Sequence, residues 1–251
     1  MTAPPSPQGT ATGSLSGSLS GSSPGPLPGP LSGLPAHPEM PPFTVLLGTD
    51  YAGKSTALAE LARISPEVRI VSADEELLGP GHSLITRLRR ALVGDVMPAL
   101  HRDYSPDFML TMLQTAVLHL RDSIARSGGD TPVLVDSYYY KILAKCRLEG
   151  LDRHPLFDWW RSFPQPQQVI FLGVSPETAW LRCGKGRDLN PLEYYGTRPD
   201  RVSFTRFQAD LHLAIRQEIG SLPVSFIGEQ DRVSSVAQGI REVLVAHEPV
   251  R

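Results

Sequence analysis

Short apolar runs recur along the chain and predict the strands of a buried sheet. They occupy residues 43–47, 68–72, 131–136, 168–172 and 223–227, and all are rich in Val, Leu, Ile or Phe. Runs of this length and composition are typical of parallel strands that are covered on both faces. Because helical patterns separate the runs, we predict an α/β fold in which a five-stranded parallel sheet is flanked by helices.

Helical patterns fill the intervals between these runs. We predict helices over residues 54–63, 83–102, 105–128 and 233–246. In the second of these, apolar residues recur every four positions from Leu84 to Val96. The third has clear ends, since Ser105 can cap it, Pro106 suits its first turn and Gly128 ends it.

The first 42 residues differ in composition from the rest of the chain. Ser, Gly and Pro dominate, and Glu39 is the only charged side chain in this segment. Such a segment cannot bury enough apolar surface to offset the entropy lost on ordering. We therefore predict a disordered tail over residues 1–42, with a docking arm for a partner as the alternative, and one folded domain over residues 43–251.

A complete P-loop pattern, Gly-(x)4-Gly-Lys-Ser, follows the first apolar run. It comprises Gly48, Thr49, Asp50, Tyr51, Ala52, Gly53, Lys54, Ser55 and the adjoining Thr56. A chance match in a chain of this length is on the order of 1 in 100. In such a loop the backbone N–H groups approach phosphates, the lysine reaches the β- and γ-phosphates, and the serine hydroxyl binds Mg²⁺. The pattern predicts a three-layer P-loop kinase fold that uses ATP and Mg²⁺, with Lys54 as a catalytic residue.

Two further features suit phosphoryl transfer. Asp136 ends the third apolar run, where a carboxylate points into the ligand crevice of a parallel sheet and can hold Mg²⁺ directly or through water. Capping of a turn is the alternative role for such a residue. Residues 176–187 open as a helix and then become glycine-rich and basic. Arg182, Lys185 and Arg187 suit a lid that neutralises developing charge, although such a segment taken alone is more often a solvated loop.

Charge and cysteine content limit the other classes of function. The formal net charge is -2, and no basic stripe interleaves with aromatic residues, so we expect no nucleic-acid partner. No apolar stretch approaches the roughly 20 residues of a membrane helix, and the N-terminus lacks a signal-peptide pattern. Cys146 and Cys183 form neither a disulfide framework nor a zinc motif. We therefore expect a cytoplasmic protein without a membrane partner.

These motifs resemble those of the thymidylate kinase family of nucleoside monophosphate kinases, over residues 43 to about 247. In that family the P-loop contains an acid that contacts the sugar hydroxyl of the acceptor, and this role falls on Asp50. The third strand of the family ends in Asp-Arg-Tyr, similar to Asp136-Ser137-Tyr138, and the lid entry Pro-Glu-x-Ala…Arg is similar to residues 176–182. The resemblance implies an ATP- and Mg²⁺-dependent kinase of a small-molecule acceptor, and it leaves a homodimer open.

The chain departs from the family pattern on the acceptor side. Ser137 replaces the arginine after the strand-three acid, and His119 stands where the family has an arginine on the preceding helix. Lys141 is the cation that remains nearby, and Tyr138 and Asp74 complete the candidate acceptor-binding set. Either Asp74 or Glu75 is also a candidate general base for a neutral hydroxyl acceptor.

The features together predict a kinase that transfers the γ-phosphoryl group of ATP to a nucleotide or nucleoside. Thymidylate kinase is the named activity that fits most of the chain. A kinase of another small hydroxylated metabolite is one alternative. A nucleotide-binding regulatory protein without acceptor chemistry is another, favoured by the missing arginines and opposed by Asp50, Asp136 and the basic lid.

Overall fold

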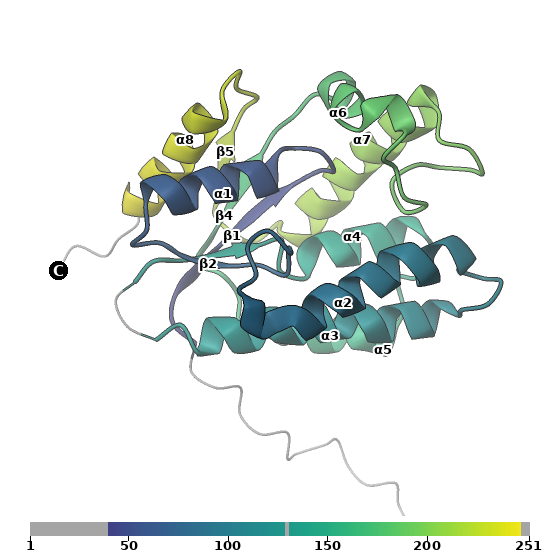
Figure 1. The fold of residues 1–251 in the computed structure, drawn as a ribbon, viewed down its shortest axis with the longest axis horizontal. Coiled ribbons are helices and arrows are strands. Elements are labelled where there is room, and N and C mark those ends of the chain that lie inside the picture. The colour runs from purple at the N-terminus through teal and green to yellow at the C-terminus, as the bar shows by residue number, and fades with distance from the viewer. Residues whose placement is uncertain (1–39, 129–130, 247–251) are drawn as a thin grey trace, which may run out of the picture. The chain divides into compact units, whose positions relative to one another are not determined.

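Five parallel strands form the central sheet of the protein (Figure 1). The computed structural model describes residues 40–128 and 131–246. The strands are β1 (Phe43–Gly48), β2 (Arg69–Val71), β3 (Val133–Asp136), β4 (Gln168–Leu172) and β5 (Val224–Ile227). Their order across the sheet is β2-β3-β1-β4-β5, and every neighbouring pair is parallel. The predicted five-stranded parallel sheet is therefore confirmed, and each apolar run overlaps one strand.

Helices cover both faces of this sheet (Figure 1). They are α1 (Lys54–Ile64), α2 (Ser83–Ala91), α3 (Pro106–Ala125), α4 (Tyr140–Leu148), α5 (Pro155–Arg161), α6 (Pro176–Arg182), α7 (Arg201–Glu218) and α8 (Val233–Ala246). Leu46 of β1 belongs to the core shared with α1 and α8, whereas Val45 and Leu47 belong to the core shared with α3, α4 and α7. Successive strand residues point to opposite faces, so a strand covered on both faces needs an unbroken apolar run. Across the described residues, no helix has the length and apolarity needed to cross a membrane.

The predicted helix over residues 83–102 is a regular α-helix only to Ala91. The chain continues past α2 as a π turn, Leu92–Val96, and then as a 3-10 turn, Met97–Ala99. Pro98 lies in the second turn and has no N–H group to continue an α-helical ladder. Leu92 and Val96 are buried, but Leu84 at the start of the four-residue apolar spacing is exposed. The spacing therefore marks neither burial along the whole segment nor the end of the regular helix.

The predicted N-terminal tail lies almost wholly outside the described residues, which begin at Met40. The Met40 side chain packs against the larger hydrophobic core. Met40 thus contacts the core although it precedes Phe43, and the domain boundary at Phe43 stays a prediction. For residues 1–39 the tail stays a prediction.

The strand register brings three loops to one edge of the sheet. Leu46 of β1 pairs with Asp136 at the end of β3, and Gly48 pairs with Leu172 at the end of β4. The P-loop, the acidic end of β3 and the connection into α6 therefore converge at the carboxyl edge. In open parallel sheets this edge is where ligands bind.

Candidate active site

The P-loop turns sharply between β1 and α1, and its two glycines are required for different reasons. A side chain on Gly48 would place its Cβ atom 2.9 Å from the carbonyl oxygen of Leu172 on the neighbouring strand. Gly53 caps α1 with a φ of 87°, a left-handed conformation that glycine adopts freely. Lys54 is the first residue of α1, where the free N–H groups of the first helical turn form an anion-binding site.

The other P-loop side chains have different surroundings. Thr49 is buried, and Ala52 packs against the core that includes α1. Lys54 and Ser55 are half-buried, and Thr56 is exposed. The loop is thus supported from inside the protein, while its lysine and serine retain access to solvent.

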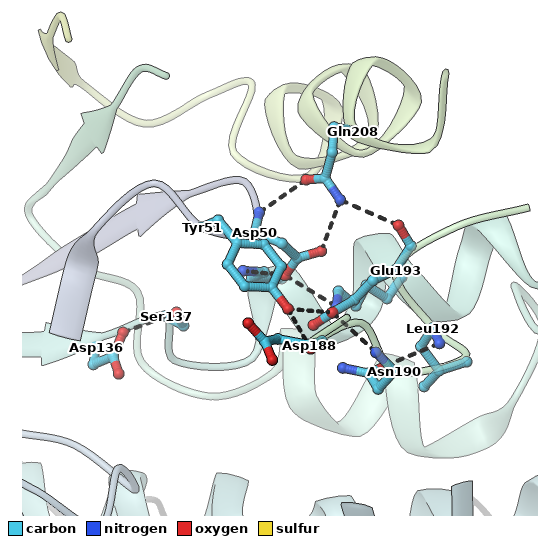
Figure 2. Close-up of polar contacts among 11 residues, drawn as sticks. Asp50, Tyr51, Asp136, Ser137, Asp188, Asn190, Leu192, Glu193 and Gln208 are labelled. Carbon is cyan, nitrogen blue, oxygen red and sulfur yellow. Dashed lines mark hydrogen bonds and ion pairs between the residues drawn. The ribbon is translucent and has the colours of Figure 1, made fainter. Parts of the chain in front are cut away.

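Asp50 is the centre of a buried charged cluster (Figure 2). Its Oδ1 atom lies 2.7 Å from Nζ of Lys141 and 3.0 Å from Nζ of Lys145, both on α4. Gln208 of α7 donates from Nε2 to Oδ2 of Asp50 at 3.1 Å, and its Oε1 accepts from the Asp50 backbone N–H at 2.9 Å. Helices α4 and α7 therefore fix the P-loop acid from two sides.

The charges of this cluster control its ionisation. Burial alone would raise the pKa of Asp50, but the positive charges of Lys141 and Lys145 outweigh burial and hold that pKa well below its usual range. Burial lowers the pKa of Lys141, while Asp50 opposes this effect and the charge of Lys54 adds to it. Lys141 is thus close to both the acid and the lysine of the P-loop.

Tyr51 links the P-loop to the segment that follows the predicted lid (Figure 2). Its hydroxyl lies 2.6 Å from the carbonyl oxygen of Asp188 and 3.0 Å from Oε2 of Glu193. Glu193 also accepts from the backbone N–H of Asn190 at 3.2 Å and lies 3.7 Å from Nζ of Lys145. Burial and the Glu193 carboxylate raise the pKa of Tyr51 well above its usual value, so the hydroxyl keeps its proton.

The predicted lid residues lie on α6 and in the turn after it. Arg182 ends α6, and its Nη1 donates to the carbonyl oxygen of Tyr51 at 3.1 Å. Lys185 has a left-handed φ of 56° in the turn, and Nε of Arg187 donates to the carbonyl oxygen of Gly184 at 3.1 Å. All three basic side chains are exposed. Of the three, Arg182 is the one in contact with the P-loop.

Hydroxyl and carboxylate oxygens gather beside the start of α1. Ser55 Oγ donates to Oδ2 of Asp74 at 2.7 Å, and Asp136 accepts from Oγ of Ser72 at 3.1 Å and of Ser137 at 3.0 Å. These hard oxygen donors suit Mg²⁺. Within the described part of the chain, no group of three or more His, Cys, Asp or Glu side chains could hold a metal. A cation here would also need phosphate or water ligands, which is how Mg²⁺ is held in kinases.

Tyr138 is the predicted acceptor-binding residue that the structure does not bring to the site. Its side chain is 1% exposed and packs edge-on against Phe43, with ring centroids 5.6 Å apart. Ser137 and Tyr138 both have left-handed φ values, 60° and 45°. Among the described residues the Tyr138 hydroxyl has no hydrogen-bond partner. The other three candidates are placed at the P-loop: Asp50 lies within it, Lys141 contacts Asp50, and Asp74 contacts Ser55.

Three residues of the charged cluster were not predicted from the sequence. They are Lys145, Glu193 and Gln208. Lys145 follows Lys141 by one helical turn on α4, so the spacing of the two lysines was an available signal. Gln208 lies 158 residues from Asp50, and no local pattern identifies such a partner.

The chain is similar to known thymidylate kinases in sequence and in fold. The thymidylate kinase of Arabidopsis thaliana is 27% identical over 215 residues, which cover 80% of this chain and 70% of the relative. The solved structure of thymidylate kinase from Candida albicans matches with a TM-score of 0.51 and 16% identity, over 82% of this chain and 92% of that chain. No protein-family model matches the chain. The structural match supports the fold, and the sequence match extends over most of the described domain.

Proposed function

Because this chain is a divergent member of the thymidylate kinase family, we propose that it is an ATP-dependent phosphotransferase with a nucleotide or nucleoside acceptor. The observation that best supports this function is the contact between the lid and the P-loop. Nη1 of Arg182 reaches the carbonyl oxygen of Tyr51 at 3.1 Å. A cation at the end of α6 is thereby placed beside the loop that would hold the transferring phosphate.

The start of α1 would hold the donor phosphates. Its free N–H groups and the Lys54 ammonium bind the anionic oxygens, and the helix dipole favours negative charge at this end. Ser55 and Asp136 would hold Mg²⁺, which neutralises charge on the β- and γ-phosphates when it is bound. Phosphoryl transfer needs positioning and charge neutralisation more than covalent participation by the protein, and these residues supply both.

The lid would supply further positive charge at the transferring group. The P-loop residue after Asp50 is Tyr51, which brings no cation to that position. Arg182, Lys185 and Arg187 are therefore the basic residues available to neutralise charge that develops during transfer. All three side chains are exposed, so they are accessible to a bound substrate.

The acceptor would lie against Asp50 and Lys141. Because the low pKa of Asp50 keeps its carboxylate ionised, this residue can accept a hydrogen bond from a sugar hydroxyl. Lys141 would face an anionic group of the acceptor, although it already contacts Asp50 at 2.7 Å. An acceptor that offers both a hydroxyl and a modest negative charge fits this pair.

An ATP-consumption screen across nucleosides, nucleoside monophosphates and small hydroxylated metabolites tests the proposal. We expect turnover with one acceptor class, and none with a folded Lys54→Ala variant, because Lys54 binds phosphate and does not support the core. Wild-type turnover in that variant would contradict the assignment.

The second candidate is a nucleotide-binding regulatory protein. The observation that favours it is the position of His119, whose ring packs on His82 with centroids 4.9 Å apart. His119, which stands where the family has an arginine, thus packs against another histidine. ATP binding without consumption on any acceptor in the screen would support this candidate.

A further inference from the structure

Glu193 lies in the turn between the predicted lid and α7 and contacts three other elements (Figure 2). Its Oε2 atom accepts a hydrogen bond from the Tyr51 hydroxyl of the P-loop at 3.0 Å, and its Oε1 atom lies 3.7 Å from Nζ of Lys145 on α4. Its carbonyl oxygen accepts from Nε2 of Gln208 on α7 at 3.4 Å. Glu193 is 9% exposed, so these contacts take the place of water around a carboxylate that would be costly to bury alone.

The turn that carries Glu193 is built around the same carboxylate. The backbone N–H of Asn190 donates to Oε2 of Glu193 at 3.2 Å, and the N–H of Glu193 donates to the carbonyl oxygen of Asn190 at 3.1 Å. Oδ1 of Asn190 accepts from the N–H of Leu192 at 2.9 Å. Because these bonds close the turn on itself, the carboxylate cannot rotate away without losing its hydrogen bond to the backbone.

Lys145 is shared between Glu193 and the P-loop acid. Its ammonium lies 3.0 Å from Oδ1 of Asp50 and 3.7 Å from Oε1 of Glu193, and its side chain is 16% exposed. With Lys141, which lies 2.7 Å from the same Asp50 oxygen, the cluster contains two ammonium groups and two carboxylates. Attraction between charges is stronger where water is largely excluded. Loss of the Glu193 charge would therefore draw Lys145 towards Asp50 and neutralise that acid more completely.

Tyr51 connects Glu193 to the basic end of α6. Its hydroxyl donates to Glu193, while its carbonyl oxygen accepts from Nη1 of Arg182 at 3.1 Å. Its side chain also packs against the hydrophobic cluster that α6 shares with Phe204 of α7. A displacement of the Glu193 carboxylate would therefore act on Tyr51 and, through the Tyr51 backbone, on Arg182.

We propose that Glu193 is a positioning residue that connects the acceptor side of the site to the lid. Through Tyr51 it fixes the place of Arg182 at the P-loop, and through Lys145 it sets the charge that surrounds Asp50. The inference rests on the proposed function in taking Asp50 as the acceptor-binding acid and Arg182 as a lid cation. The connection itself consists of contacts within the protein, so it can be tested without turnover.

Amide hydrogen exchange of the nucleotide-free protein, resolved by NMR, tests the connection. The Asn190 amide reports on the lid side, because it donates to the Glu193 carboxylate. The Asp50 amide reports on the acceptor side, because it donates to Oε1 of Gln208, which also contacts Glu193. We expect both amides to exchange about tenfold faster or more in Glu193→Ala, since a hydrogen bond to a charged group contributes that much to a local opening equilibrium.

Glu218→Ala is the matched control. Glu218 is also on the α7 side of the sheet and largely buried, with a side chain 10% exposed, but it pairs with Arg161 of α5 at 3.0 Å. We expect exchange at Asn190 and Asp50 to stay at the wild-type rate in this variant. Tyr51→Phe removes the Glu193 contact from the P-loop end and serves should Glu193→Ala not fold, with faster exchange expected at Asn190.

Kinetics with the acceptor found in the ATP-consumption screen separate the two contacts of Glu193. Glu193→Gln keeps an oxygen for the Tyr51 hydroxyl but has no charge facing Lys145. We expect this variant to raise the acceptor KM about tenfold and to change kcat little, because a more neutralised Asp50 accepts a hydroxyl less well. Tyr51→Phe is expected to do the reverse. A wild-type acceptor KM in Glu193→Gln would overturn the role of Glu193 at Asp50.

The exchange experiment distinguishes this inference from the proposed function. Faster exchange at both amides in Glu193→Ala, in a protein that consumes no ATP, would refute the kinase and retain the connection. In a protein that consumes ATP, wild-type exchange at Asp50 in Glu193→Ala would retain the kinase and overturn the connection. Equal acceleration at Asn190, at Asp50 and in the central strand β1 would show that Glu193 serves general stability, and it would also overturn the inference.

Discussion

The hydroxyl of Tyr51, inside the P-loop, lies 3.0 Å from the Glu193 carboxylate, which follows the lid in the sequence. The same hydroxyl lies 2.6 Å from the carbonyl oxygen of Asp188. Together with the Arg182 contact to the Tyr51 carbonyl, these bonds hold the lid segment to the phosphate-binding loop from two sides. Contacts within the protein therefore position the segment that contains the predicted lid beside the P-loop.

Replacement of Tyr51 by Phe should impair transfer more than binding. The variant loses hydrogen bonds to a carboxylate and a carbonyl, and a bond to a charged group is worth about 1.5–3 kcal/mol. We expect kcat to fall about tenfold or more, with ATP Kd changed little, because the phosphate-binding backbone is untouched. Steady-state kinetics and isothermal titration calorimetry measure the two quantities.

Tyr195→Phe is the matched control for this variant. Its hydroxyl donates to Oδ2 of Asp210 on α7 at 2.9 Å, so the variant loses a hydrogen bond to a carboxylate that does not involve the P-loop. Equal losses of kcat in the two variants would show that the Tyr51 hydroxyl serves general stability and not lid position.

Asp50 should make the stability of the protein depend on acid pH. Folding lowers the pKa of Asp50 below its ordinary value of 3.8, so its ionisation stabilises the fold above that value, and this contribution is lost as the pH falls further. We expect the free energy of unfolding to drop as pH is lowered from about 5 towards 2. In Asp50→Asn this part of the drop should disappear, as measured by urea unfolding at several pH values.

At neutral pH, Asp50→Asn should also be less stable than the wild type by roughly 3–5 kcal/mol, because Lys141 and Lys145 lose a buried counter-charge. Asp103→Asn serves as the control, since Asp103 forms an exposed pair with Arg102. A fully stable Asp50→Asn protein would mean that the two lysines find solvent or another acid without cost.

The lid arginine at the P-loop should carry much of the charge neutralisation. We predict that at least one alanine change among Arg182, Lys185 and Arg187 lowers kcat by about 10²-fold or more, or about 3 kcal/mol of transition-state stabilisation. The Tyr51 contact makes Arg182 the strongest candidate, with only a modest change in ATP Kd. If all three variants keep the wild-type kcat, the segment is a solvated basic loop.

The sheet could be predicted from the sequence because its strands are buried on both faces and therefore read as unbroken apolar runs. The P-loop could be predicted because its residues form one contiguous pattern in the sequence. Gly48 allows the close approach of Leu172 from β4, and Gly53 allows a left-handed turn. The end of the α2 helix could not be placed, because apolar spacing continues through Leu92–Val96 although the backbone becomes a π turn. The spacing is insensitive to the hydrogen-bond pattern of the backbone, and it does not fix burial either, since Leu92 and Val96 are buried whereas Leu84 is exposed.

The surroundings of the site depended on contacts between distant segments. Tyr138 follows the strand-three acid and suited an acceptor role, but successive left-handed residues at Ser137 and Tyr138 accompany a side chain that is buried in the core. Gln208 meets Asp50 only because α7 packs beside the P-loop. Neither outcome is encoded in a short motif, since both follow from backbone turns and helix packing.

Thymidylate should be at best a poor acceptor. Its dianionic phosphate must approach the γ-phosphate of ATP, and two like charges need cations between them, yet Ser137 and His119 stand where the family has arginines. Lys141 and Lys145 are present, but Asp50 already contacts both, and Glu193 lies 3.7 Å from Lys145.

A lysine also lacks the bidentate fork with which arginine grips a phosphate. We therefore expect kcat/KM for thymidylate to fall below about 10⁴ M⁻¹s⁻¹, the lower end of the ordinary enzyme range, and to fall further in Lys141→Ala. Thymidine, which lacks the phosphate, should lose less in the same variant, because only a charged group needs the ammonium. A kcat/KM for thymidylate of about 10⁴ M⁻¹s⁻¹ or above that does not change in Lys141→Ala would contradict this expectation. It would mean that cations other than those around Asp50 hold the acceptor phosphate.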